Sequence, residues 1–222
     1  MASYLILGAG KFGRLALRRL SAQDRSGRFL LIDRRPQALA EARTSGGEGA
    51  EMLEGDVISY LTAHLAPGFP WDWLIPMVPV HVAYAWLVSG PLAGQGWEPA
   101  PVPGDLGNLA PRSITGSHGE LYLSQARHLC PDDCDEPPVC PVTGLERRQP
   151  LFRKLAGSTC PGWSMLVVAS RQLAPGVGGY SHKELVKLAE TAAQAPGPLL
   201  VATACRCHGV VHGLRRKGVR PA

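Results

Sequence analysis

A glycine-rich turn near the start of the chain has the spacing of a phosphate-binding loop. The turn consists of Gly8, Ala9, Gly10, Lys11, Phe12 and Gly13. The apolar residues 4–7 before it predict a buried strand, and residues 11–22 after it have helical spacing, with Phe12 on the apolar face. In this context the three glycines allow a tight turn, a close approach to a pyrophosphate and a close contact between helix and strand. The free N–H groups and the dipole at the helix start favour bound phosphate.

An acidic residue completes the expected nucleotide site. Residues 28–33 predict a second strand that ends at Asp33, 20 positions after Gly13. A carboxylate there accepts hydrogen bonds from the ribose hydroxyls of adenosine. Arg34 and Arg35 follow at once and are compatible with a 2′-phosphate, so both NAD and NADP stay open. The predicted cofactor-binding residues from these motifs are Gly8, Gly10, Lys11, Phe12, Gly13, Asp33 and Arg34.

Five of the six cysteines fall in two tight groups that indicate metal binding. The first group has the spacing C-x3-C-x5-C in a loop rich in proline and acidic residues, which a bound metal would order. The second group follows a predicted strand, where ligands of open α/β sheets bind. A helix over residues 208–212 would place His208 and His212 on one face. Cys160 is isolated. The predicted metal ligands are Cys130, Cys134, Cys140, Cys205, Cys207 and His208.

The nature of the cysteine centre stays open. Thiolate-rich ligation suits an iron–sulfur cluster, held by the first group together with Cys205 or Cys207. The same thiolates with His208 would make a tetrahedral zinc site. The spacing matches no common ferredoxin or zinc-finger pattern. Two other interpretations are a redox-active pair of Cys205 and Cys207 beside Arg206 and His208, and a set of reduced or disulfide-bonded cysteines.

No residue can be assigned as catalytic from the sequence. His81 follows a predicted strand near the expected nicotinamide position, as an acid–base group or as a structural histidine. His118 and His182 are expected at the surface. The glycine-rich residues 175–180 are either a second anion cradle or a connection without a ligand.

An alternation of strands and helices must position these residues. Strands are predicted over residues 4–7, 28–33, 51–56, 71–76, 164–170 and 199–203, and a hairpin over 114–123. Helices are predicted over residues 11–22, 37–43, 57–65, 80–88 and 181–194, with Asp56 and Ser181 as caps. The pattern predicts an α/β fold with a Rossmann-like, mostly parallel sheet covered on both faces.

Composition divides the chain into three parts. Residues 1–89 are expected to form a Rossmann-type nucleotide-binding half. Residues 90–111, with five glycines and five prolines, predict a linker or a long surface loop. Residues 112–222 form a cysteine-rich, metal-binding segment with two further strands and a helix. Either these strands complete the first sheet, with the linker and cysteine segment as an insertion, or they belong to a small second domain.

The first 80 residues or so resemble the TrkA-type (RCK) nucleotide-binding domains that regulate potassium transport. The resemblance rests on the glycine turn, on Leu31-Ile32-Asp33-Arg34 and on Glu54-Gly55-Asp56. It implies a Rossmann fold that binds an adenine nucleotide, with Asp56 beside the adenine. It also implies a homodimer and a membrane-transport partner, but no chemistry.

The bulk composition is that of a globular protein rich in loops. The 222 residues are 45% hydrophobic and 18% charged, with 26 glycines and 20 prolines. The net charge of +5 is scattered, and the basic residues 214–220 are expected to be a solvated terminus, so nucleic acid is not an expected partner. Residues 73–88 are too short and interrupted for a membrane span. We expect a cytoplasmic protein, in which reduced thiols favour metal or redox chemistry.

Together these features predict an NAD(P)-binding redox protein, an NAD(P)-linked oxidoreductase that couples the nucleotide to a cysteine-ligated iron–sulfur or zinc centre. Its partner would be a redox protein, and the two sites are expected to lie close together. The alternative is a regulatory module that senses nucleotide or redox state. A third interpretation is a zinc-stabilised structural protein with a vestigial nucleotide site.

Overall fold

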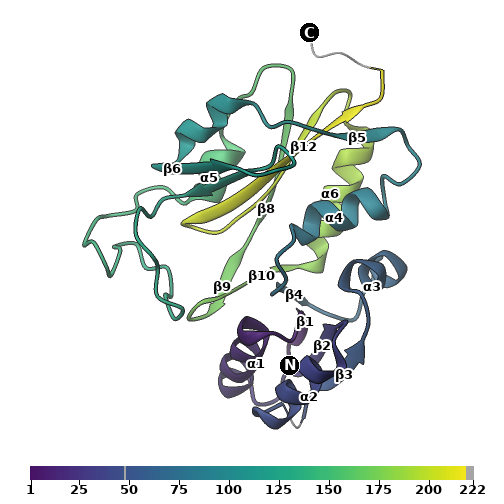
Figure 1. Ribbon diagram of the computed structural model, residues 1–222, viewed down its shortest axis with the longest axis vertical. Coiled ribbons are helices and arrows are strands. Elements are labelled where there is room, and N and C mark those ends of the chain that lie inside the picture. Colours follow the sequence, from purple (N-terminus) through teal and green to yellow (C-terminus); the bar gives the residue numbers. More distant parts are fainter. Residues whose placement is uncertain (48, 219–222) are drawn as a thin grey trace.

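A computed structural model describes residues 1–47 and 49–218 of the chain (Figure 1). This part has a mixed α/β architecture, with two sheets of six strands each and helices packed against them. Val219 and Arg220 of the basic terminus lie outside the described residues. Among the described helices, none is long and apolar enough to cross a membrane.

The first sheet has the strand order β3-β2-β1-β4-β10-β9. Its strands are β1 (Ser3–Leu7), β2 (Arg28–Asp33), β3 (Glu51–Glu54), β4 (Trp73–Pro76), β9 (Arg171–Ala174) and β10 (Val177–Ser181). The first four are parallel, and β10 runs antiparallel to both β4 and β9. The central strand β1 buries Leu5, Ile6 and Leu7 completely, as expected for a parallel strand covered on both faces.

Six α-helices connect and cover the strands in the described part of the chain. They are α1 (Lys11–Gln23), α2 (Pro36–Thr44), α3 (Val57–His64), α4 (Val82–Ser89), α5 (Leu151–Ala156) and α6 (His182–Gln194). The predicted cap of α3 is confirmed, since an Asp56 carboxylate oxygen accepts a hydrogen bond from the backbone N–H of Ser59 at 2.8 Å. The prediction that Phe12 faces the core is wrong. The buried side of α1 begins one residue later, at Gly13, which leaves Phe12 48% exposed.

The second sheet has the strand order β6-β7-β12-β11-β8, and β5 also pairs with β12. Its strands are β5 (Trp97–Ala100), β6 (Arg112–Thr115), β7 (Leu121–Ser124), β8 (Ser164–Ala169), β11 (Leu199–Ala204) and β12 (His208–Arg216). The predicted hairpin is confirmed by the antiparallel pair β6–β7. The helix considered over residues 208–212 is instead the start of β12.

Of our two expectations for β8 and β11, the first, that they complete the first sheet, is wrong. They pair with each other in the second sheet, and the hairpin β9–β10 takes the place beside β4. The glycine-rich residues 175–180 therefore form most of a strand rather than an anion cradle. Packing explains this sequence, because a Cβ on Gly179 would lie 2.6 Å from Ile75 Cδ1 and 2.9 Å from the Leu74 carbonyl oxygen.

The segment 90–111 is not a free linker. It provides β5 and a 3-10 helix (Gly104–Leu109), and it buries Trp97, Ala100 and Leu106. The main apolar core also crosses between the sheets, because it joins Leu7 and Trp71 to Val201 and Leu214. The two sheets thus share one core, which fixes the position of any site formed at their junction.

Candidate functional site

The glycine turn has the close packing that its sequence predicts. Gly8 has a φ of +109°, and a Cβ there would lie 2.7 Å from the Met77 carbonyl oxygen. A Cβ on Gly13 would overlap the carbonyl oxygen of Gly8. Gly10 caps α1 without a side-chain hydrogen bond. The first N–H groups of α1 therefore have no side-chain cap at Gly10 and can bind an anion.

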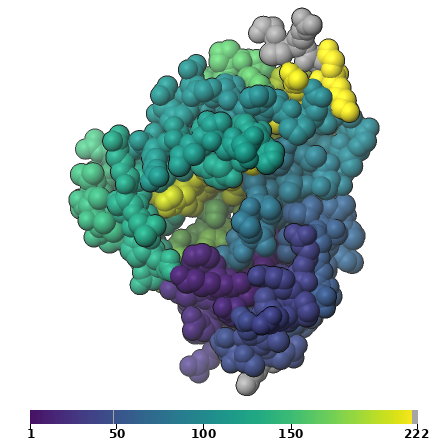
Figure 2. All heavy atoms as spheres, in the orientation of Figure 1, coloured from purple at the N-terminus to yellow at the C-terminus, as the bar shows by residue number. Residues whose placement is uncertain are grey.

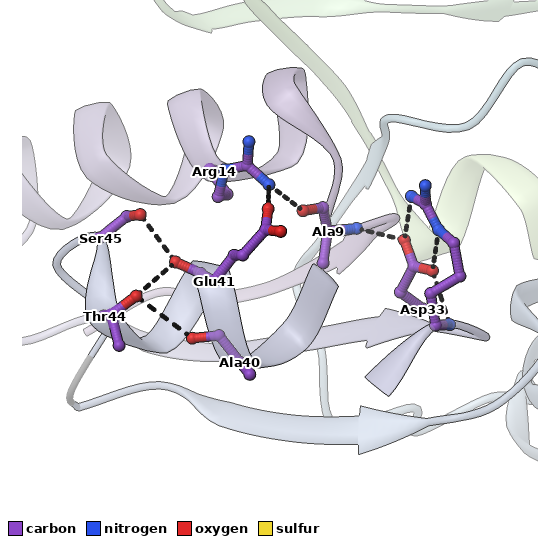
Figure 3. Close-up of polar contacts among 8 residues, drawn as sticks. Ala9, Arg14, Asp33, Ala40, Glu41, Thr44 and Ser45 are labelled. Carbon is purple, nitrogen blue, oxygen red and sulfur yellow. Dashed lines mark hydrogen bonds and ion pairs between the residues drawn. The ribbon is translucent and has the colours of Figure 1, made fainter. Parts of the chain in front are cut away.

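Asp33 holds the turn in place through its carboxylate (Figure 3). One oxygen accepts from the backbone N–H of Ala9 at 2.8 Å and from Arg35 Nη2 at 3.2 Å. The other accepts from the backbone N–H of Arg35 at 2.9 Å and from its Nε at 3.1 Å. Burial raises the pKa of Asp33, but the Arg35 guanidinium and the N–H donors outweigh it and lower the pKa to about 2. A ribose hydroxyl would have to displace Arg35 to bind this carboxylate.

Two cavities flank this carboxylate. The glycine-turn cavity, of about 620 Å³, is lined by Gly10, Lys11, Arg14, Arg34, Arg35, Pro36, Gln37, Ala38 and Glu41. Arg14 crosses to Glu41 at 2.7 Å on one side of it (Figure 3). A neighbouring cavity of about 600 Å³ shares Arg34 and Arg35 and reaches Asp56, with residues 57–58 and 78–80 as its apolar wall. The arrangement can hold an anion beside a flat apolar group.

The cysteine segment, residues 128–149, lies against the glycine turn although it is distant in sequence. It has no helix or extended strand, only an isolated bridge between Val139 and Glu146. Lys11 Nζ forms an ion pair with Asp132 at 2.7 Å, and Arg19 Nη1 donates to the Asp132 carbonyl oxygen at 2.8 Å. The segment is thereby fixed beside the start of α1.

The cysteine cavity, of about 450 Å³, lies between this segment, α1 and the loop before β12. Figure 2 shows a hollow on this face, bordered by the N-terminal residues in purple, the cysteine segment in teal-green and β12 in yellow. Its lining includes Cys130, Cys134, Cys205, Cys207 and His208, together with Phe12 of α1. The structure therefore brings four of the five grouped cysteines to one cavity, beside the glycine turn.

Sulfur and imidazole nitrogen atoms lie close to one another in this cavity. Cys205 Sγ lies 4.0 Å from His208 Nδ1, and Cys130 Sγ lies 3.8 Å from the other ring nitrogen, Nε2, so His208 can share a metal with one of these two thiols at a time. Cys140 is placed at the edge of this group, where its Sγ is 3.7 Å from His128 Nε2. With the usual bond lengths of a tetrahedral zinc site, sulfur and nitrogen ligands lie about 3.6 Å apart. The donors therefore fit a metal ion with mixed sulfur and nitrogen ligation.

Sequence reasoning missed two residues of this group, Glu136 and His128. Glu136, Cys205 and His208 offer ligand atoms that all lie within 4.8 Å of one another. His128 Nε2 lies 3.9 Å from Cys130 Sγ as well as near Cys140. The spacing His128-x-Cys130 could have identified the histidine, whereas Glu136 is one of several acidic residues in its loop.

Burial keeps most of these thiols in the neutral form. It raises the pKa of Cys130 and Cys205, and it raises the pKa of Cys207 to about 12, with the charge of Glu136 acting in the same direction. Cys140 differs, since hydrogen bonds from Thr143 outweigh burial and lower its pKa to about 6. A bound cation would favour the thiolate form of all of them. The buried Nη1 of Arg147, which has no oxygen or nitrogen partner, supplies positive charge beside them.

The remaining candidate residues lie elsewhere. Cys160 packs in the apolar cluster of the second sheet. His81 Nδ1 pairs with His212 Nδ1 at 3.0 Å, its Nε2 contacts the Thr203 hydroxyl at 2.8 Å, and burial lowers its pKa to about 3. The expectation that His182 lies at the surface is wrong, because it is buried with its Nδ1 2.8 Å from the Trp71 carbonyl oxygen.

Comparison with known proteins identifies relatives of this chain. Residues 73–217 match a family model described as "Uncharacterized protein, C-terminal domain". This match begins at β4 and includes both cysteine groups. A protein of Archaeoglobus fulgidus, named "Uncharacterized protein", is 33% identical over 223 residues, which cover 96% of this chain and 99% of the relative. No solved structure matches the chain significantly. The chain belongs to the family that this model describes.

Proposed function

We propose that this protein binds an adenine dinucleotide, NAD or NADP, at the glycine turn and couples it to a cysteine-ligated metal centre in a redox reaction. One observation carries the proposal: Phe12, in the first turn of α1, lines the same cavity as Cys130, Cys134, Cys205 and Cys207. A dinucleotide whose pyrophosphate lies over the glycine turn has one end within reach of this cavity.

The nucleotide part of the proposal rests on the first sheet. Four parallel strands in the order β3-β2-β1-β4, with α1 behind the glycine turn, are the arrangement of a Rossmann-like mononucleotide-binding half. The phosphate would take the N–H groups of α1 and the cations Lys11 and Arg14. The adenosine would lie toward Asp56 and residues 78–80, as the resemblance to TrkA-type domains also implies.

The metal part rests on the donor set. Four thiols, one imidazole and one carboxylate line the cysteine cavity, with Cys140 and His128 at its edge, which fits zinc with mixed ligands and also leaves enough thiolates for an iron–sulfur cluster. The metal would be held by Cys205 and His208, from β12 and the loop before it, and by Cys130 and Glu136, from the cysteine segment. When bound, an iron–sulfur cluster supplies an electron acceptor and zinc supplies a Lewis acid. Arg147 would offset the negative charge of a thiolate-rich centre.

The chain's own residues prepare this site for chemistry. Lys11 and Arg19 hold the cysteine segment against α1, so that the wall formed by Phe12 and the thiols has a fixed spacing. The hydrogen bond from the Gly176 N–H to the Cys134 carbonyl oxygen, 2.8 Å, ties the same segment to the β9–β10 hairpin. A positioned acceptor beside a positioned nucleotide is what electron transfer between them requires.

The same contacts favour a second candidate function, a sensor of nucleotide or redox state. The ion pair between Lys11 and Asp132 joins the phosphate-binding position directly to the cysteine segment. A nucleotide phosphate that recruits Lys11 would weaken this pair and change the hold on the segment. Such a module would transmit the change to a partner protein without turnover.

The test begins with protein purified without oxygen. Iron, sulfide and zinc are quantified, NADH and NADPH are titrated by calorimetry, and their oxidation is followed with an artificial electron acceptor. We expect one metal centre per chain, saturable nucleotide binding and turnover. Cys205→Ser and Cys130→Ser should both lower the metal content, whereas the matched variant Cys160→Ser should retain it. Binding without turnover would support the sensor instead, and absence of both nucleotide and metal would refute the proposal.

A further inference from the structure

A second cavity lies on the other side of the cysteine centre. This arginine cavity, of about 600 Å³, has a size that suits a small molecule. It is lined by Pro111, Gln125, Arg127, His128, Cys140, Thr143, Leu145, Glu146, Arg147, Arg148, Gln149 and Lys154. Arg147 lines both this cavity and the cysteine cavity, so the two cavities are neighbours.

The arginine cavity is lined by more cations than acidic groups. Four of its lining residues are cations, and only Arg148 has an acidic partner, Glu146 at 3.1 Å. Within residues 1–47 and 49–218, the other three cations form no ion pair with a carboxylate. Cations gathered around one concave surface repel one another and raise the local affinity for anions.

The cationic wall is held in place by hydrogen bonds. Lys154 Nζ donates to Gln125 Oε1 at 3.4 Å, and Gln125 Nε2 donates to the Gln149 carbonyl oxygen at 3.0 Å. The backbone N–H of Gln125 donates to the Cys207 carbonyl oxygen at 2.7 Å. The wall that carries Lys154 is therefore tied to the loop of the cysteine centre, and a ligand would meet this ammonium group already ordered.

We propose that the arginine cavity binds a small anion with two or more negative charges on phosphate or carboxylate oxygens. Planar guanidinium groups match both kinds of oxyanion, and the two cations that face neither a carboxylate nor the thiols, Arg127 and Lys154, match a ligand of that charge. Its use as the substrate pocket of the cysteine centre rests on the function proposed above, because Cys140 and His128 form part of its wall. The binding itself does not depend on that function.

The experiment is a calorimetric titration of the full chain with inorganic phosphate, pyrophosphate and citrate at constant ionic strength. We expect saturable binding of at least one of them with one site per chain. The two phosphate compounds and the tricarboxylate distinguish the two oxyanion types. Lys154→Gln and, as an independent variant, Arg127→Gln should each weaken the binding about tenfold or more. Arg153→Gln removes the neighbouring charge on α5, outside the cavity, and should leave the affinity unchanged.

Three results would overturn the inference. The first is the absence of saturable binding of all three anions, and the second is an equal loss of affinity in Lys154→Gln and Arg153→Gln. Because the glycine turn can also take phosphate, Arg14→Gln is measured alongside, and a loss of affinity in Arg14→Gln but not in Lys154→Gln would place the anion at the glycine turn and overturn the inference. Metal content and NADPH affinity are determined on the same samples. If both stay at their wild-type values while no anion binds, this inference fails and the proposed function stands.

Discussion

Replacement of Asp33 by asparagine should lower the free energy of unfolding at neutral pH, and this difference from wild type should disappear at low pH. The folded-state pKa of Asp33 is about 2, against an ordinary value of 3.8. At 1.36 kcal/mol per pKa unit, this difference corresponds to at most about 2.5 kcal/mol. The Arg35 side chain is 68% exposed, so water screens part of the attraction, and we expect Asp33→Asn to lose about 1–2 kcal/mol at pH 7.

The sign of the pH dependence follows from the lowered pKa. The stabilisation by Asp33 is present above pH 4, where the unfolded carboxyl is ionised, and it is lost as the pH falls through 2. Urea unfolding of both proteins at pH 7 and pH 3 should show the difference falling to about half. The exposed Asp105 serves as a control, and Asp105→Asn should change the stability by less than about 0.5 kcal/mol at both values. A difference between Asp33→Asn and wild type that does not change with pH would refute the reasoning.

Three further predictions test the turn, the cofactor and the metal. Gly13→Ala should lower the unfolding free energy by about 3 kcal/mol or more in urea titrations, because its Cβ would overlap the Gly8 carbonyl oxygen, whereas Gly55→Ala has open space and should have little effect. Calorimetry should show that Arg35→Ala lowers the affinity for NADPH about tenfold and leaves the affinity for NADH unchanged or higher. The substitution removes a partner of the 2′-phosphate and frees the Asp33 carboxylate for the ribose. An equal loss of affinity for both nucleotides would argue against this. After a chelator removes the metal, limited proteolysis should cleave residues 128–149 earlier than it cleaves the first sheet. A cleavage rate that does not depend on the chelator would contradict a metal that orders this segment.

Local features of the chain could be predicted from the sequence because neighbouring residues decide them. The glycine turn, the strand that ends at Asp33 and the Asp56 cap each depend on a few adjacent positions. Tertiary packing decided the rest. β10 contains Gly178 and Gly179, which have low strand propensity. It is a strand because it pairs with β4 and β9, and these neighbours leave no room for a side chain at Gly179.

The candidate site could be predicted only where residue types stand out in the sequence. The grouped cysteines are such a signal, and the structure brings them together. Glu136 is not, since a single glutamate in an acidic loop looks like any solvated charge. The contact between His81 and His212 joins residues 131 positions apart and has no local signal at all. Likewise, the burial of Trp97 and Leu106 could not be predicted, because the glycines and prolines around them indicate a loop.

Phe12, the residue that was wrongly expected in the core, bears most directly on how the two sites are connected. Helix α1 packs on its sheet through Gly13, Ala16, Leu17 and Leu20, so the core does not require an aromatic side chain at position 12. Phe12 instead lines the cysteine cavity, with Lys11 Nζ 5.1 Å from its ring centroid. The same lysine pairs with Asp132 of the cysteine segment. Lys11 thus contacts the thiol-bearing segment, and Phe12 faces the same cavity as its cysteines. This is the arrangement expected if the proposed nucleotide and the cysteines act together rather than as separate sites.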